Sequence, residues 1–200
     1  MVIIEEMEQT ILWIWQLLLQ KIWEAIIPLG ALGAAIGACL TAYKMKRIEQ
    51  MRFFTELLSE YSSPSMENAL KTLGDIKERK DEDSEFWKDF VKFWKENRKK
   101  RSKIYKEYPG VSEARRRVSH HYTTALELYL NKKCINKRFL EIICQGDGFK
   151  RFLFGVVEHL EQALNPEYAR WQFDKLLELS GLSEKEMSKL QRTRPPKKLR

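Results

Sequence analysis

Cysteine and histidine are scarce in this chain, which has three of each among 200 residues. The cysteines, Cys39, Cys134 and Cys144, are odd in number and widely spaced. This pattern excludes a disulfide framework and is typical of a reducing compartment. The cysteines and histidines also lack the short paired-ligand spacings of structural zinc sites, so the sequence predicts neither a metal nor a cofactor.

The sequence also lacks any stretch in which apolar and polar residues alternate as they do along a half-buried strand. It has no phosphate loop, because Gly146-Asp147-Gly148 lacks both the glycine spacing and the Lys-Ser/Thr pair of that motif. We expect these three residues to break a helix, with Asp147 capping the next one. The absence of strand patterns predicts an all-α fold.

Charged residues are absent between positions 25 and 42. An uncharged apolar run of about 20 residues predicts a transmembrane helix, here over residues 22–43. Residues 1–21 precede it, and their tryptophans favour a segment that lies at the membrane interface. A single long tilted helix from Thr10 onward is the alternative.

Two glycines within this predicted span, Gly33 and Gly37, form a GxxxG pair. Small residues four positions apart lie on one helix face and allow two helix backbones to approach closely. The pair therefore favours association of two copies of the helix, which would make the protein a homodimer.

The charge of the chain differs sharply on the two sides of the predicted span. Residues 1–43 carry one base and four acids, whereas residues 44–200 carry 35 bases and 24 acids. Cytoplasmic flanks of membrane helices collect Lys and Arg. The sequence therefore predicts a single-pass protein of the cell's inner membrane, with its N-terminus outside and its basic C-terminal domain in the cytoplasm.

Residues 44–182 carry the apolar spacing of amphipathic helices and predict a cytosolic bundle of about five to seven helices after the transmembrane helix. Residues 183–200 predict a short helix and a basic tail. Helix starts are indicated at Ser63-Pro64, Ser112, Asn136 and Ser183, the last with Glu186 as a capping box. Apolar residues from Phe149 to Leu164 predict one α-helix.

Several short motifs resemble those of uncharacterised, small, membrane-anchored helical proteins of bacteria. They are residues 52–66, which begin Arg-Phe-Phe, residues 114–118 with His121-Tyr122, and residues 157–166. The resemblance covers most of residues 22–177. It implies a single-pass anchor and a helical cytosolic domain, and it supplies no catalytic residue.

Two basic runs carry the strongest remaining functional pattern, and each is suited to an anionic surface, either the lipid leaflet or nucleic acid. Aromatic residues accompany the first run at Trp94, Tyr105 and Tyr108. The predicted contact residues are Lys95, Arg98, Lys99, Lys100, Arg101, Lys103 and Lys106 in the first run, and Arg192, Arg194, Lys197, Lys198 and Arg200 in the second.

Three functions follow as hypotheses. The first is a membrane-anchored interaction or scaffold protein, whose basic domain contacts an unidentified protein partner and membrane lipid. The second is a membrane-tethered nucleic-acid-binding or sensor protein. The third is an enzyme built on His121 and His159, although no nucleophile or acid accompanies either residue in a known motif.

Overall fold

The computed structural model describes residues 2–131, 134–165 and 170–195, with side chains left out at positions 2–12, 14 and 25–31. Every regular element in these ranges is a helix. They are α1 (Val2–Tyr61), α2 (Pro64–Glu82), α3 (Ser84–Glu96), α4 (Arg101–Glu107), α5 (Pro109–Leu130), α6 (Lys137–Gln145), the π-helix η1 (Gly148–Val157), α7 (Glu158–Leu164), α8 (Arg170–Leu179) and α9 (Glu184–Thr193).

The chain divides into two compact units, Met1–Glu49 and Gln50–Arg200. The first unit is helical throughout its described part. A Cβ added at Gly33 or Gly37 would meet no atom within 4 Å, so the glycine face is open. Association of two copies through this face stays a prediction.

No helix in the described residues is both long and apolar enough to cross a membrane. This finding contradicts the predicted transmembrane helix at residues 22–43. It also contradicts the inner-membrane location and the orientation that followed from that helix.

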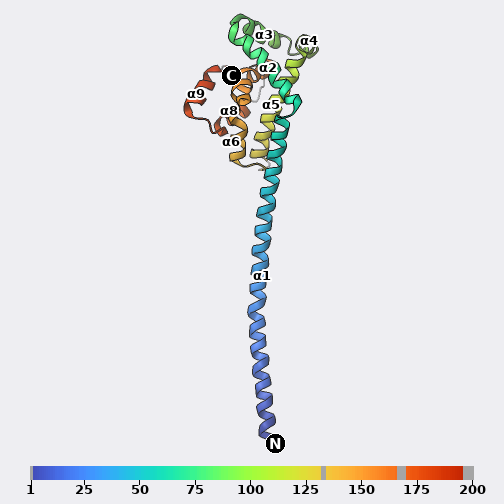
Figure 1. The fold of residues 1–200 in the computed structure, drawn as a ribbon, viewed down its shortest axis with the longest axis vertical. Coiled ribbons are helices and arrows are strands. Elements are labelled where there is room, and N and C mark those ends of the chain that lie inside the picture. The colour runs from blue at the N-terminus through green and yellow to red at the C-terminus, as the bar shows by residue number, and fades with distance from the viewer. Residues whose placement is uncertain (1, 132–133, 166–169, 196–200) are drawn as a thin grey trace. The chain divides into compact units, whose positions relative to one another are not determined.

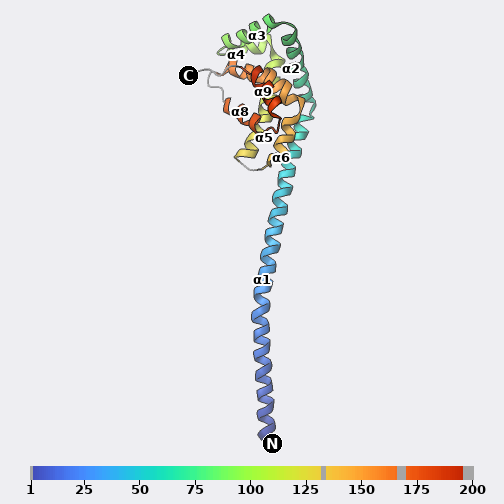
Figure 2. The same cartoon turned by 90° about the vertical axis from the view of Figure 1, so that its left-hand side faces the viewer.

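The second unit, Gln50–Arg200, is the helical domain. Nine helices follow α1 in its described part. Eight of them lie before residue 183, more than the five to seven expected there, because α3 and α4 are separate helices and η1 is distinct from α7, and α9 lies where a separate short helix was predicted. In both views of the structure, α3 and α4 lie at one end of this unit and α6 at the other (Figures 1 and 2). Its core is rich in aromatic rings, including the fully buried Trp94, Tyr122, Phe149 and Phe154.

Most of the predicted helix starts are confirmed by hydrogen bonds from the capping side chains. Ser63 accepts from the backbone N–H of Met66, with Pro64 in the first turn, and Asn136 accepts from Phe139. Ser183 and Glu186 form the reciprocal capping box. The predicted cap at Ser112 is wrong, because α5 begins at Pro109 and the Ser112 side chain is buried inside it.

The apolar segment that predicted one α-helix from Phe149 is instead a ten-residue π-helix, η1, followed by α7. Asp147 precedes η1 without capping it through its side chain. In η1 the buried residues include Phe154 and Gly155, which an α-helical face through Phe149 and Leu153 would not contain. The element is surrounded by α2, α5, α6, α7 and α9, so it buries a wider face than one stripe.

Candidate functional site

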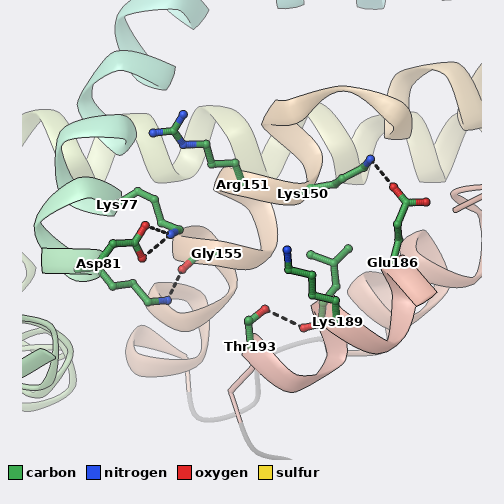
Figure 3. Close-up of a pocket in the computed structure, with 10 residues that line it drawn as sticks. Lys77, Asp81, Lys150, Arg151, Gly155, Glu186, Lys189 and Thr193 are labelled. Carbon is green, nitrogen blue, oxygen red and sulfur yellow. Dashed lines mark hydrogen bonds and ion pairs between the residues drawn. The ribbon is translucent and has the colours of Figure 1, made fainter. Parts of the chain in front are cut away.

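A cavity of about 420 Å³ lies between α2, η1 and α9 in the helical domain (Figure 3). Its wall is strongly basic, with five bases and two acids. The lining residues are Lys77, Lys80, Asp81, Lys150, Arg151, Gly155, Glu186, Lys189, Leu190 and Thr193. Ligand pockets commonly measure about 300–1,000 Å³, so this cavity is large enough for a small molecule.

The two acids of the cavity are already paired with bases on its wall. Lys77 forms an ion pair with Asp81 one helical turn away. Lys150 of η1 donates to Glu186 of α9 at 2.8 Å, and this bond together with those from Ser183 lowers the pKa of Glu186 to about 2. The cavity therefore keeps a net positive charge after these pairs are counted.

Lys80 occupies a partly buried position at the edge of the cavity. Its ammonium donates to the backbone oxygen of Gly155 at 2.6 Å and lies 4.3 Å from the centre of the Trp87 ring. Burial, followed by the neighbouring charge of Lys77, lowers the pKa of Lys80 to about 8. A cation in such a place is poorly solvated, and an added negative charge would stabilise its protonated form.

The π-helical geometry of η1 brings Lys150 and Gly155 to the same cavity. Residues five positions apart lie about one turn apart in a π-helix, because the backbone bonds run from i to i+5. In an α-helix, five residues make about 1.4 turns and the two would face different sides. A Cβ on Gly155 would lie only 3.3 Å from the Cε of Lys77. The glycine therefore permits the Lys77 side chain to pack closely against η1.

The histidines of the enzyme hypothesis occupy two separate surroundings. His121 is buried, with its Nδ1 3.3 Å from a carboxylate oxygen of Glu60. His159 donates from Nε2 to the backbone oxygen of Thr193 at 2.9 Å and meets the Trp87 ring edge-on. Among the described residues, no three His, Cys, Asp or Glu side chains are grouped to hold a metal.

Acidification is expected to destabilise the helical domain through His159. Burial, and then the charge of Lys80, lower the pKa of His159 to about 4, so folding favours the neutral ring. This stability is present above the unfolded pKa of about 6.5 and is lost as the pH falls toward 4. Urea unfolding at several pH values should show a loss of about 2 kcal/mol from this residue.

The substitution His159→Gln isolates this contribution, because the glutamine amide can still donate to Thr193. It is expected to flatten the dependence of unfolding free energy on pH between 6.5 and 4. His120 is exposed, so His120→Gln should keep the slope of the unchanged protein. Equal slopes for all three proteins would contradict the assignment.

The first basic run lies along the end of α3, the following turn and α4. Ile104 is buried and fixes the run to the core, and Asn97 bonds back to the backbone oxygen of Phe93. Six of the seven basic side chains are exposed and Arg98 is half-buried. Within the described part of the chain, none of the seven forms an ion pair.

The aromatic residues near this run differ in accessibility. Trp94 is fully buried in the core and is not available for stacking on a ligand. Tyr108 is half-buried and packs edge-on against Phe90 and Phe93. Tyr105 is 42% exposed, so it alone of the three predicted aromatics presents an open ring beside the bases.

The second basic run does not form one surface. Arg192 is exposed on α9, whereas the side chain of Arg194 is only 4% exposed and pairs with the fully buried Glu158 and with Asp174. Lys197, Lys198 and Arg200 lie outside the described residues. Arg194 therefore holds the fold together and does not face an external anion.

The cavity residues were missed by the sequence analysis because they come from three segments far apart in the chain. Lys77 and Lys80 belong to a charged stretch that reads as a solvated linker, and Lys150 and Arg151 sit in an apolar run. The spacing of three between Lys77 and Lys80 places both on one helix face. That spacing is the one local indication of the site.

No protein-family model, curated protein or solved structure shows a significant match to this chain. The resemblance to bacterial membrane-anchored helical proteins therefore stays a prediction.

Proposed function

We propose that the helical domain is a nucleic-acid-binding interaction module, with residues 95–106 as its contact surface. The observation that carries the proposal is the set of seven bases in this run that form no ion pair within the described part of the chain. Bases that are not neutralised by neighbouring acids are free to contact phosphates.

Phosphate contacts supply most of the affinity of nonspecific nucleic-acid binding, because each neutralised phosphate releases counterions. The buried Ile104 holds α4 on the domain, so the bases are presented on a folded element. The exposed ring of Tyr105 offers a surface on which a base of a single strand can stack. These features together support a nucleic acid as the partner.

Anionic lipid is a weaker candidate than the sequence suggested. Its preference over nucleic acid depended on a transmembrane helix that would hold the domain at the membrane, and that helix is contradicted. An acidic protein surface remains a different class of partner. The experiment below distinguishes nucleic acid from anionic lipid and from an acidic protein.

Binding to a 20-base-pair duplex is expected to weaken with salt, with a slope of about −6 in log affinity against log salt concentration if all seven bases contact phosphate. The variant with Lys99, Lys100 and Lys103 changed to glutamine should reduce this slope by about 2.7, because each contact contributes about 0.9. Fluorescence anisotropy on the full chain measures both values.

The matched control changes three exposed bases on other helices, Lys71 on α2, Arg138 on α6 and Lys185 on α9, to glutamine. It removes the same charge and should leave the slope close to that of the unchanged protein. Equal loss in the two triple variants would contradict a local contact surface. Binding to anionic vesicles without binding to the duplex would contradict the proposal and indicate lipid as the partner. Absence of binding to either the duplex or the vesicles would also contradict it and indicate an acidic protein.

A further inference from the structure

We propose that the cavity between α2, η1 and α9 binds a small molecule through a phosphate monoester group. This site is distinct from the surface formed by residues 95–106 and shares no residue with it. The inference goes beyond nucleic-acid binding, because it concerns a small metabolite held inside the domain.

The shape of the cavity supports a small ligand. Its volume of about 420 Å³ lies at the lower end of the range of ligand pockets, which suits a phosphorylated sugar better than a long polymer. Leu190 and the aliphatic stems of the lysines supply an apolar part of the wall. The ammonium groups supply the polar part.

The charges facing the cavity select a doubly negative group. Asp81 and Glu186 are paired with Lys77 and Lys150. Arg151 lies 3.5 Å from a carboxylate oxygen of the exposed Glu78 and 5.5 Å from the centre of the Phe152 ring. Lys189 forms no ion pair among the described residues, and its side chain extends from α9 toward η1 (Figure 3). A phosphate monoester carries close to two negative charges at neutral pH, whereas a diester of the nucleic-acid backbone carries one.

Attraction between charges grows in proportion to the charge of the ligand. A site with five bases and two acids therefore favours the monoester over the diester. This preference for a doubly charged group distinguishes the cavity from a contact surface for the nucleic-acid backbone, whose phosphates are diesters. Lysine is a common phosphate ligand because its ammonium is a compact charge with three donors.

Lys80 is the group whose state should respond to the ligand. The titratable groups around it are Lys77 and Asp81 on α2, Lys150 and Arg151 on η1, His159 on α7, whose ring is neutral, and Lys189 on α9. The bases outnumber the one acid of this set, Asp81, which is paired with Lys77; together with burial, this agrees with the lowered pKa of Lys80, about 8. A bound phosphate would raise this pKa, so binding near pH 8 should take up a proton.

The first experiment titrates the full chain with ribose 5-phosphate, inorganic phosphate, dimethyl phosphate and ribose by isothermal calorimetry at pH 8. Ribose 5-phosphate and inorganic phosphate are expected to bind. Dimethyl phosphate should bind at least tenfold more weakly, and ribose should not bind. Equal affinity for dimethyl phosphate, or no binding of either dianion at millimolar concentration, would overturn the proposal.

Two charge reversals on α9 test the position of the site. Lys189 lines the cavity and Lys185 does not, yet both are exposed lysines on one helix. Lys189→Glu should weaken ribose 5-phosphate binding at least tenfold, whereas Lys185→Glu should change it less than twofold. An equal effect of the two variants would indicate a general field of positive charge and would overturn the assignment to this cavity.

A second measurement detects the proton that Lys80 is expected to take up when the ligand binds. With a pKa of about 8, Lys80 is only partly protonated at pH 8, so binding of ribose 5-phosphate should take up a fraction of a proton, measured in buffers of different ionisation enthalpy. Lys80→Arg keeps the charge at this pH and should retain binding while losing the uptake. Unchanged uptake in this variant would overturn the role of Lys80.

The two proposals can fail separately. The Lys99, Lys100 and Lys103 variant should keep its affinity for ribose 5-phosphate, and Lys189→Glu should keep most of the duplex affinity. If one surface bound both ligands, each variant would impair both measurements, and the proposal of a separate phosphate cavity would be overturned.

Discussion

Replacing Arg194 by methionine is expected to lower the free energy of unfolding of the helical domain by about 3–5 kcal/mol. The Nε of Arg194 lies 2.7 and 2.9 Å from the two carboxylate oxygens of Glu158. Glu158 is fully buried, so this contact is an ion pair formed away from water. Breaking a buried ion pair by removing one partner is strongly destabilising, because the other charge stays away from water.

The contact joins two parts of the chain that are distant in sequence. Glu158 begins α7, whereas Arg194 follows α9, and Asp174 of α8 adds a second carboxylate 2.8 Å from the guanidinium. The guanidinium also lies 5.2 Å from the centre of the Phe154 ring. Loss of Arg194 is therefore expected to loosen the packing of α7, α8 and the end of α9.

The measurement is urea unfolding followed by circular dichroism at pH 7. Arg192→Met is the matched control, because Arg192 is exposed two residues earlier, and it should change stability by no more than about 0.5 kcal/mol. The double variant Glu158→Leu with Arg194→Met should recover much of the loss, since it removes the buried carboxylate together with its arginine. Equal stability of the Arg192 and Arg194 variants would show that the pair is not important for folding.

Gly148→Ala is expected to destabilise the domain by about 3 kcal/mol, near the upper end of the cost of overpacking a core. A Cβ at this position would clash with the hydroxyl oxygen of Tyr61 and would lie 3.1 Å from that of Tyr122. Both rings are held by neighbours, with Tyr61 against His121 and Tyr122 against Phe149. The added methyl group would force these rings or the start of η1 to move.

The neighbouring glycine provides the control for this substitution. A Cβ at Gly146 would lie 3.9 Å from the same Tyr61 oxygen, an ordinary contact, and the backbone of Gly146 has a φ of −65°, which alanine adopts easily. Gly146→Ala should be neutral or stabilise by a few tenths of a kcal/mol. If thermal or urea unfolding gave both variants the same stability, the close approach at Gly148 would be disproved.

The amphipathic faces and most of the helix starts were predictable because they depend on neighbours within one turn. Met66, Ala69, Leu73 and Ile76 fall on one face of α2 and are all buried there. Capping at Ser63, Asn136 and Ser183 needs only a side-chain oxygen and a backbone N–H two or three residues ahead. Such local rules hold whatever the rest of the chain does.

The two basic runs differ in a property that local sequence patterns do not predict, namely the exposure of the basic side chains. Both appeared in the sequence as equivalent clusters of charge, yet the first is exposed and the second contains Arg194, which is buried against Glu158. The sequence offers no means to match these two residues, because they are 36 positions apart. Charge alone does not tell whether a base faces solvent or a partner inside the domain.

The cavity could not be predicted from the sequence, because it forms only when three distant segments pack together. Its bases come from α2, η1 and α9, and Lys150 reaches the wall beside Gly155 because η1 is a π-helix and not the α-helix that the apolar spacing predicted. The predicted span at residues 22–43 is likewise contradicted, because no helix in the described part of the chain is long and apolar enough to cross a membrane.

By itself, the sequence determined the all-α class, the buried faces of the helices and their caps, because these follow from contacts between residues a few positions apart. Only the tertiary structure decided which charges are paired, which aromatic rings are accessible and which lysines converge on one cavity. The physical reason is that burial and ion pairing depend on the distances between segments, and those distances are set by the packing of the whole core.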